Sequence, residues 1–184
     1  FCPARAIAMK PHISGQWFVS DTRHGPLVHA RLGIAEGNSG KLVTLIKKKA
    51  REIAAEKGFE LVIVDGSPGT GCPVIATMSG ATVALIVTEP TVSGIHDLQR
   101  VYELARHFNV RAAVCVNKAD INPENTAAIG SFCAGNGIPL VGAIPYDTDI
   151  TGAQFAGKSV VEHSTGPAAE AIRKIWHEVE HALR

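Results

Sequence analysis

Residues 110–120 read "VRAAVCVNKAD", in which a run of apolar residues after Arg111 ends in a short polar cluster. A continuous run of this length predicts a strand buried on both faces, as in parallel sheets. Further runs of the same character lie at 59–65, 82–88 and 138–144. Helical patterns alternate with these runs at 41–57, 92–108, 123–134 and 167–183. The sequence therefore predicts an α/β fold: a doubly wound, mainly parallel sheet with helices on both faces.

Local signals set the ends of several of these elements. Pro123 after Asn122 predicts the start of the 123–134 helix, and Ser93 is a plausible cap for 92–108. Gly58 predicts the end of the 41–57 helix. That helix places one apolar stripe toward the core, formed by Leu42, Leu45, Ile46, Ile53 and Ala54. Before residue 35, two alternating segments split by Arg23-His24-Gly25 predict a β-hairpin.

The composition indicates a globular domain with no electrostatic case for binding nucleic acid. The chain has 184 residues, 46% hydrophobic and 19% charged, with a net charge of +1. The basic run at 47–51 falls inside a helix and is expected to be solvated. No apolar stretch approaches the roughly 20 residues of a membrane span, and the spread of the cysteines is ordinary for reduced thiols, so a cytoplasmic location is expected.

The first strand end reads "LVIVDGSPGTG" at 61–71 and combines a carboxylate with a glycine-rich loop. An apolar strand followed by Asp65 is a Walker-B-like pattern, which places a carboxylate where Mg²⁺ and its waters would lie. Gly66, Gly69 and Gly71 allow the loop to pass close to a phosphate, and Pro68 stiffens it. This segment therefore predicts a site for Mg²⁺ and phosphate.

The strand at 110–117 ends in Asn117, Lys118, Ala119 and Asp120. The Asn amide can bond a purine edge, the Lys stem can pack over the base, and the Asp can accept hydrogen bonds from ring or exocyclic N–H groups. This spacing after a buried strand predicts base recognition. The structural alternative is an Asn-Lys turn with Asp120 capping the next helix.

The other two strand ends add residues at the same edge, because ligands of doubly wound sheets bind at the carboxyl ends of the strands. Pro145 and Tyr146 are expected to line the base pocket, and Asp147 to cap a short helix near 149–156. The segment 88–90, Thr-Glu-Pro, ends the second strand. We therefore expect four strand ends to face one nucleotide.

The segment "GIAEGNSGKLV" at 33–43 only approximates a phosphate-binding loop. The pattern G-x-x-x-x-G-K-[ST] needs a first glycine and a metal-binding hydroxyl. Ala35 stands at the first position and Leu42 follows Lys41. Residues 38–40, Asn-Ser-Gly, are instead predicted to cap the start of a helix.

Two short motifs at the ends of the chain also suggest metal chemistry. "HEVEH" at 177–181 matches the zinc-binding pattern H-E-x-x-H, but without a third ligand after it a surface helix is predicted, and a zinc hydrolase stays as an alternative. Cys2-Pro3 matches the end of a bacterial ferredoxin run without its other cysteines.

Six segments in order give the chain a family resemblance: "FCPARAI", "GPLVHARLGIAEGNSGKLV", "VDGSPGTGCPVIA", "VTEPTVSGIHDLQR", "VNKAD" and "IPYD". It resembles the MinD/ParA/Mrp branch of P-loop ATPases, and more closely the CobQ/CobB/MinD/ParA-type nucleotide-binding proteins with a ferredoxin insert. The family's phosphate loop, of the form KGGxGKT, lies near the N-terminus and is missing from this sequence. The resemblance thus implies an N-terminally truncated chain, with residues 1–12 a remnant of the insert and 13–184 the C-terminal portion of a P-loop NTPase domain.

The resemblance also implies roles and partners. Asp65 would organise Mg²⁺ through water, and the loop around Pro68 and Gly69 would sense the γ-phosphate of ATP. Asn117 and Asp120 would read adenine. The base pocket would be lined by Pro145, Tyr146 and Asp147. Cys2 would be a ligand of a [4Fe-4S] cluster in the parent protein, which would form a homodimer around nucleotide and work with an iron–sulfur or redox partner.

The activity implied for the parent protein is ATP hydrolysis coupled to cluster handling, electron delivery or metallocofactor assembly. The 184-residue chain alone is expected to be inactive, because no phosphate loop is present in it. Two alternatives stay open. Asn-Lys-x-Asp also suits guanine, which would make the parent a GTPase of the metallochaperone kind, although Pro68 stands where GTPases place a glycine. The other alternative is a regulatory or scaffold module without catalysis.

Overall fold

The computed structural model describes residues 3–4, 6, 12–34, 36–37 and 39–183. The chain divides into two compact units. The first comprises Phe1–Ser67 with Cys72–Thr77, and the second Pro68–Gly71 with Met78–Arg184. This division does not test the predicted boundary between residues 12 and 13, which stays a prediction.

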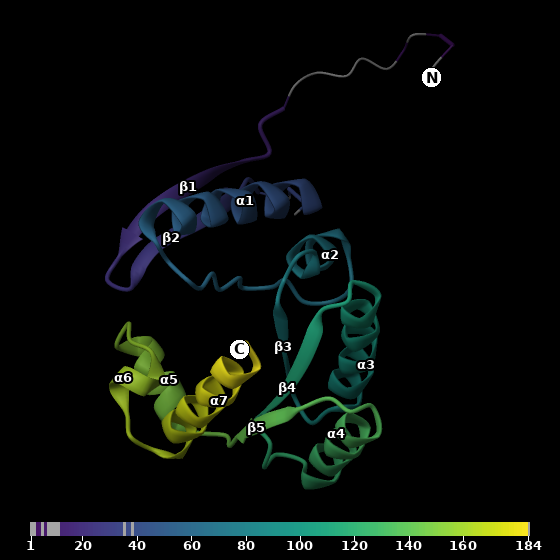
Figure 1. Cartoon of the computed structure of the whole chain (residues 1–184), viewed down its shortest axis with the longest axis vertical. Coiled ribbons are helices and arrows are strands. Elements are labelled where there is room, and N and C mark those ends of the chain that lie inside the picture. Colours follow the sequence, from purple (N-terminus) through teal and green to yellow (C-terminus); the bar gives the residue numbers. More distant parts are fainter. Residues whose placement is uncertain (1–2, 5, 7–11, 35, 38, 184) are drawn as a thin grey trace. The chain divides into compact units, whose positions relative to one another are not determined.

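The second unit is built on a parallel sheet in the order β3-β4-β5. Its strands are β3 (Val83–Thr88), β4 (Arg111–Asn117) and β5 (Leu140–Ile144). Thr88 pairs with Val116, and Asn117 pairs with Ile144, so the three carboxyl ends lie at one edge of the sheet (Figure 1). The predicted α/β class with a parallel sheet is confirmed.

Helices cover both faces of this sheet (Figure 1). On one face, α3 (Val92–His107) and α4 (Pro123–Gly135) pack against β3 and β4. On the other face, α7 (Pro167–Leu183) packs against β5. Alternate residues of β4 serve the two faces: the buried cluster beneath α3 and α4 contains Val114 and Val116, whereas Cys115 packs with Ile175 and Val179 of α7. Each fully buried aliphatic side chain contributes about 1.5–3 kcal/mol relative to an exposed one.

The helix starts follow the local sequence closely. At α4, the side chain of Asn122 accepts a hydrogen bond from the Asn125 amide at 3.0 Å, and Pro123 opens the first turn, as predicted. At α3, the cap is Thr91, whose Oγ1 accepts from the Gly94 amide at 2.9 Å. The prediction of Ser93 as the cap was wrong, since Ser93 already lies within the first turn.

The described residues also form three shorter helices: α2 (Cys72–Met78), α5 (Thr148–Phe155) and α6 (Val160–His163). The sequence predicted α5 but neither of the others. Both have too few residues to show a helical period, so pattern alone gives little signal for them.

The first unit contains a hairpin and a long helix. Strands β1 (Gly15–Thr22) and β2 (Gly25–Leu32) pair antiparallel with Thr22 opposite Gly25, which confirms the predicted hairpin. Helix α1 (Gly40–Lys57) begins after Ser39, whose side chain accepts from the Leu42 amide. The near-miss phosphate motif is therefore a capped helix start, as predicted, although Ala35 and Asn38 lie outside the described residues.

The buried face of α1 differs from the predicted stripe. Leu45 is 45% exposed, whereas Val43 and Lys47 are each only 7% exposed. The Nζ of Lys47 donates to the carbonyl of Ala76 at 2.8 Å and to that of Thr77, in α2. The expectation of a solvated basic run was thus wrong at Lys47, because its ammonium group satisfies carbonyls of α2 while its apolar stem packs.

The expected strand at 59–65 is absent from the described residues. Its apolar side chains are exposed, Ile63 by 76%. A strand requires a hydrogen-bonded neighbour, and the strand pairs of the described residues are β1 with β2, β3 with β4, and β4 with β5. The apolar pattern predicted the composition of a strand correctly but had no means of showing that a partner is present. None of the described helices has the length and apolar character that crossing a membrane requires.

Candidate functional site

Polar contacts tie the three strand ends of the second unit together. The Nζ of Lys118, after β4, lies 2.8 Å from Oε1 of Glu89, after β3. The Oδ1 of Asp120 accepts a hydrogen bond from the backbone amide of Tyr146, after β5, at 2.7 Å. Three of the four predicted strand ends therefore converge in this unit, whereas the fourth, which ends at Asp65, belongs to a segment that forms no strand.

Lys118 adopts a left-handed backbone conformation, with φ of 52°. This conformation costs a residue with a side chain roughly 1–2 kcal/mol. The side-chain contact with Glu89 raises the pKa of Lys118, first through the hydrogen bond and then through the charge of the carboxylate. Lys118 is thus held at the edge as a cation whose charge is balanced by the neighbouring strand end.

Asn117 and Asp120 present open hydrogen-bonding groups beside this ion pair. Among the described residues, no partner is found for the side-chain amide of Asn117, which is half-buried. Asp120 uses Oδ1 for the Tyr146 amide, which leaves Oδ2 as an acceptor. An amide that donates and accepts, next to a carboxylate oxygen, can read the edge of a purine base.

A layer of hydrogen bonds supports the loops that carry these residues. The side chain of Asn125 donates to the carbonyl of Pro90 at 3.0 Å, and the hydroxyl of Thr126 donates to the carbonyl of Ala119 at 2.7 Å. The buried hydroxyl of Thr88 donates to the carbonyl of Gly94 at 2.9 Å. Sequence reasoning missed these residues, because their acceptor carbonyls are 35, 7 and 6 residues away in the chain and these separations form no recognised motif.

The carboxylate of Asp147 accepts hydrogen bonds at the starts of two helices. Its Oδ1 accepts from the Asp149 amide at 2.9 Å, which caps α5 as predicted, and its Oδ2 accepts from the Ala168 amide of α7 at 3.3 Å. Tyr146, by contrast, is 58% exposed. Both carboxylate oxygens of Asp147 are therefore used in the fold. Its place in a base pocket, with Pro145 and Tyr146, stays a prediction.

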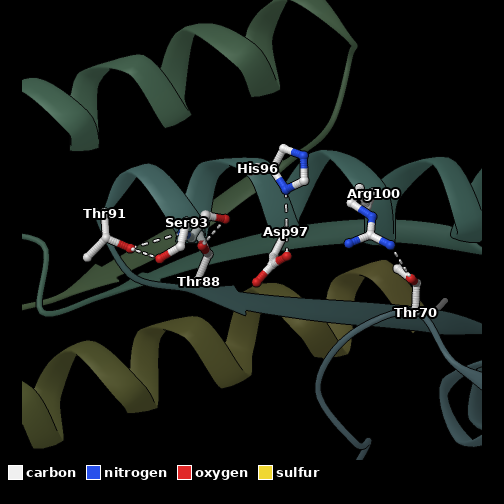
Figure 2. A network of polar contacts seen from close by, with 8 residues as sticks. Thr70, Thr88, Thr91, Ser93, His96, Asp97 and Arg100 are labelled. Atoms are coloured by element: carbon white, nitrogen blue, oxygen red, sulfur yellow. Dashed lines mark hydrogen bonds and ion pairs between the residues drawn. The ribbon is translucent and has the colours of Figure 1, made fainter.

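The glycine-rich loop contributes Pro68–Gly71 to the second unit. Pro68 and Gly69 are exposed, and Gly69 has a φ of 84°, a conformation that favours glycine. Figure 2 shows the Nη2 of Arg100, on α3, donating to the Thr70 hydroxyl at 2.9 Å. The loop is thus connected to the helix that follows β3, which sequence reasoning did not foresee.

The same view shows polar contacts along α3. Near its start, the hydroxyls of Thr91 and Ser93 lie 3.1 Å apart, and further along, Nδ1 of His96 lies 3.8 Å from Oδ1 of Asp97 (Figure 2). Asp65 lies outside this network, in an exposed segment of the first unit. Its assignment to Mg²⁺ stays a prediction.

The described cysteines do not form a metal cluster. Cys72 is exposed, whereas Cys115 and Cys133 are buried. Burial raises the pKa of Cys115 to about 11 and also raises that of Cys133. Within the described part of the chain, no group of three or more His, Cys, Asp or Glu residues is placed to hold a metal ion. Cys2, the predicted iron–sulfur ligand, lies outside the described residues.

Comparison with known proteins identifies relatives over most of the chain. It is 31% identical over 155 residues to an uncharacterized protein of Methanocaldococcus jannaschii, covering 84% of this chain and 51% of that protein. It is 24% identical over 144 residues to the septum site-determining protein MinD of Neisseria meningitidis, covering 71% and 52%. The chain is a relative of the MinD/ParA-type P-loop ATPases. No protein-family model matches it.

A third relative is an iron–sulfur cluster assembly factor. This cytosolic Fe-S cluster assembly factor, the Nubp1 homolog of Drosophila melanogaster, is 26% identical over 136 residues, covering 62% of this chain and 44% of that protein. The chain thus spans about half the length of these relatives.

Solved MinD structures share the fold. MinD of Aquifex aeolicus superposes with a TM-score of 0.67 at 22% identity, covering 89% of this chain and 68% of that one. MinD of Pyrococcus horikoshii, complexed with Mg-ADP, superposes with a TM-score of 0.63 at 19% identity, covering 77% and 57%. The α/β architecture of this chain is therefore that of MinD.

Proposed function

We propose that this chain forms the base-reading and switch portion of a MinD/ParA-type ATPase that uses ATP and Mg²⁺. The observation that carries the proposal is the set of tied strand ends, where the Asn117 amide and Oδ2 of Asp120 stand beside the Lys118–Glu89 ion pair. The Mg-ADP complex of the Pyrococcus horikoshii relative supports the choice of nucleotide and metal.

In this proposal, each residue at the edge binds or orients the nucleotide. Asn117 and Asp120 bind the purine edge, and the stem of Lys118 covers the base plane. Pro145 and Tyr146 line the pocket, with Asp147 fixing the helix that follows. When bound, ATP supplies the phosphoanhydride that is hydrolysed, and Mg²⁺ neutralises its phosphate oxygens.

The glycine-rich loop is proposed to be the switch. Asp65 orients Mg²⁺ through a water molecule, and Pro68 and Gly69 respond to the γ-phosphate. The hydrogen bond between Thr70 and Arg100 gives that loop a direct connection to α3. A change in the loop would therefore reach α3 without passing through the sheet.

We further propose that the parent protein couples this switch to an iron–sulfur module. Cys2 is proposed as a cluster ligand, and the Nubp1 relative, an Fe-S cluster assembly factor, supports this direction. The proposal includes a homodimer around nucleotide, an iron–sulfur or redox partner and a cytoplasmic location. The Aquifex aeolicus relative has been solved in complex with MinC, so association with a partner has a precedent among these relatives.

A GTPase of the metallochaperone kind is the second candidate. The observation that favours it is the Asn117-Lys118-Ala119-Asp120 spacing, because the free oxygen of Asp120 can accept from N1 and N2 of guanine as well as from adenine N–H groups. Adenine and guanine therefore have to be distinguished by experiment.

The test follows backbone amide NMR shifts of the 184-residue chain during titration with adenosine and then guanosine. We expect adenosine to shift residues 117–120 and Tyr146, and Asn117→Ala to abolish those shifts, because the base contacts do not depend on a phosphate loop. Glu124→Gln, an exposed carboxylate in the first turn of α4, is the matched control and should behave as wild type. Stronger shifts with guanosine would favour the GTPase, and no shift with either nucleoside would contradict a base site here.

The lack of a phosphate-binding loop in the sequence gives a separate prediction about ATP. We expect the 184-residue chain neither to hydrolyse ATP nor to bind it more tightly than adenosine, since the sequence contains no G-x-x-x-x-G-K-[ST] loop. Calorimetry with ATP and adenosine compares the two affinities. Sub-micromolar binding of ATP would show that this chain carries its own phosphate site.

A further inference from the structure

Two histidines of α7 face one another across one turn of the helix. His177 and His181 are four residues apart, a spacing that places side chains on the same face. Their Nε2 atoms lie 3.3 Å apart and their ring centroids 4.7 Å apart. Both side chains are exposed, so a dissolved ion has access to them.

The separation of the two nitrogens is that of two ligands on one metal ion. A tetrahedral zinc ion with Zn–N bonds of about 2.0–2.1 Å holds two nitrogen ligands about 3.3–3.4 Å apart. The Nε2 atoms of His177 and His181 have this spacing without any change in the backbone of α7. Imidazole nitrogens suit Zn²⁺, Cu²⁺ and Ni²⁺, whereas Mg²⁺ and Ca²⁺ take oxygen ligands.

A carboxylate lies near the other nitrogen of one ring. The Oε2 of Glu180 is 3.9 Å from Nδ1 of His177. Histidines that bind metals usually donate the second ring N–H to a carboxylate or carbonyl, which fixes the tautomer and makes the ligating nitrogen more basic. His177 therefore has one nitrogen beside His181 and the other near a carboxylate, although 3.9 Å is too long for a hydrogen bond.

We propose that His177 and His181 form a two-histidine binding site for a divalent transition-metal ion of the zinc, copper and nickel class. Water completes the coordination, because the described residues offer no group of three or more metal-ligating side chains. The site therefore differs from a catalytic zinc centre with three protein ligands, and it is independent of the nucleotide site.

The test is isothermal titration of the 184-residue chain with Zn²⁺ in a non-chelating buffer. We compare wild type with His177→Ala, His181→Ala and the double variant. The control is His107→Ala, which removes an exposed helical histidine of α3 that has no histidine within one turn. The wild type and the control should bind one equivalent that each single variant binds roughly tenfold more weakly or worse. The double variant should bind zinc about as weakly as the single variants, because the loss of either imidazole already removes the chelate.

A second measurement does not depend on heats of binding. Zn²⁺ should raise the melting temperature of the wild type and of His107→Ala but not that of either single variant, since an ion that bridges two positions of α7 stabilises the folded state. Alanine is the strongest helix former, and circular dichroism verifies that the variants keep their helices. Equal zinc binding by all variants would overturn the proposal. A loss of half of the bound zinc in each single variant would also overturn it, because that result indicates two histidines that bind independently.

Discussion

At the scale of single residues, the candidate site depends on a lysine in an unfavourable backbone conformation. Lys118 has a positive φ, and its ammonium group is 2.8 Å from Glu89. The cost of the left-handed conformation is accepted where the surrounding structure fixes it, and such residues concentrate at functional sites. The Glu89 contact and the Asp120–Tyr146 bond provide that fixation on either side.

The charge of Glu89 should therefore set the pKa of Lys118. In Glu89→Gln, the pKa of Lys118 should fall toward its ordinary value, since the carboxylate that raises it is gone. A pH titration followed by side-chain NMR measures this. The folded-state pKa of the wild type is raised, so the ion pair stabilises the fold fully below the unfolded value of about 10.4 and is lost as the pH rises through the folded-state pKa. An unchanged pKa in Glu89→Gln, compared with Glu124→Gln, would contradict the pairing.

A second residue-scale prediction concerns the buried lysine of α1. In Lys47→Ala, the carbonyls of Ala76 and Thr77 lose their donor and the packed stem disappears, which should cost about 1–3 kcal/mol of unfolding free energy. Lys48→Ala is the matched control, because Lys48 is exposed on the same helix and should change stability by less than about 0.5 kcal/mol. Urea denaturation compares the two. Equal effects would mean that the burial of Lys47 contributes nothing.

Stability should also depend on pH through Lys47. Burial, and then the nearby charge of Arg51, lower the pKa of Lys47 in the folded state. Between that lowered value and the unfolded value of about 10.4, the unfolded chain binds more protons, so stability attributable to this group rises with pH. The rise should be smaller in Lys47→Ala than in Lys48→Ala when unfolding is measured across the alkaline range.

At the scale of elements, what could be predicted depended on whether the determining interaction is local. Asn122 and Pro123 fix the start of α4 within a few residues, so the sequence was sufficient there. The prediction of a strand at 59–65 was wrong, because an apolar run does not specify its hydrogen-bonded neighbour. Lys47 was placed on the solvated face for a similar reason, since its acceptors in α2 are about thirty residues away.

The residues of the candidate site could be predicted from the sequence, but the contacts between them could not. The polar strand ends were predictable, because parallel strands bring their carboxyl ends to one edge. The contacts that hold those ends, such as Lys118 with Glu89 and Arg100 with Thr70, depend on side-chain geometry across the fold, which no spacing in the sequence encodes.

The packing of α7 on β5 gives an element-scale prediction. A Cβ added at Gly142 would lie 2.5 Å from Cγ1 of Ile175, a residue buried between the helix and the sheet. Gly142→Ala should therefore destabilise the protein by about 1–3 kcal/mol through overpacking. Gly130→Ala is the matched control: it lies inside α4, the nearest atom to its Cβ is 4.0 Å away, and the change should stabilise by about 0.5–1 kcal/mol. Thermal denaturation measures both effects, and melting temperatures that change in the same direction in both variants would contradict this packing.

At the scale of the whole molecule, the thiols report on the core of the second unit. Cys115 lies in the central strand between the two helical layers and is 1% exposed, and Cys133, on the buried face of α4, is also 1% exposed. Cys72, at the start of α2, is exposed. A reagent therefore reaches Cys115 or Cys133 only when the unit opens, whereas Cys72 is accessible in the folded state.

Alkylation with iodoacetamide at about pH 8, followed by peptide mass spectrometry, should modify Cys72 before Cys115 and Cys133, since reaction requires an accessible thiolate. Burial holds the pKa of Cys115 at about 11, so even transient access finds few thiolates there. In denaturant Cys72, Cys115 and Cys133 should react at similar rates. Because Cys115 contacts α7 on one face and its neighbours in β4 contact α3 and α4 on the other, its labelling rate should fall as global stability rises. Gly142→Ala should therefore accelerate the labelling of Cys115 and leave that of Cys72 unchanged. Equal rates for Cys115 and Cys72 in the native protein would contradict a sheet covered on both faces.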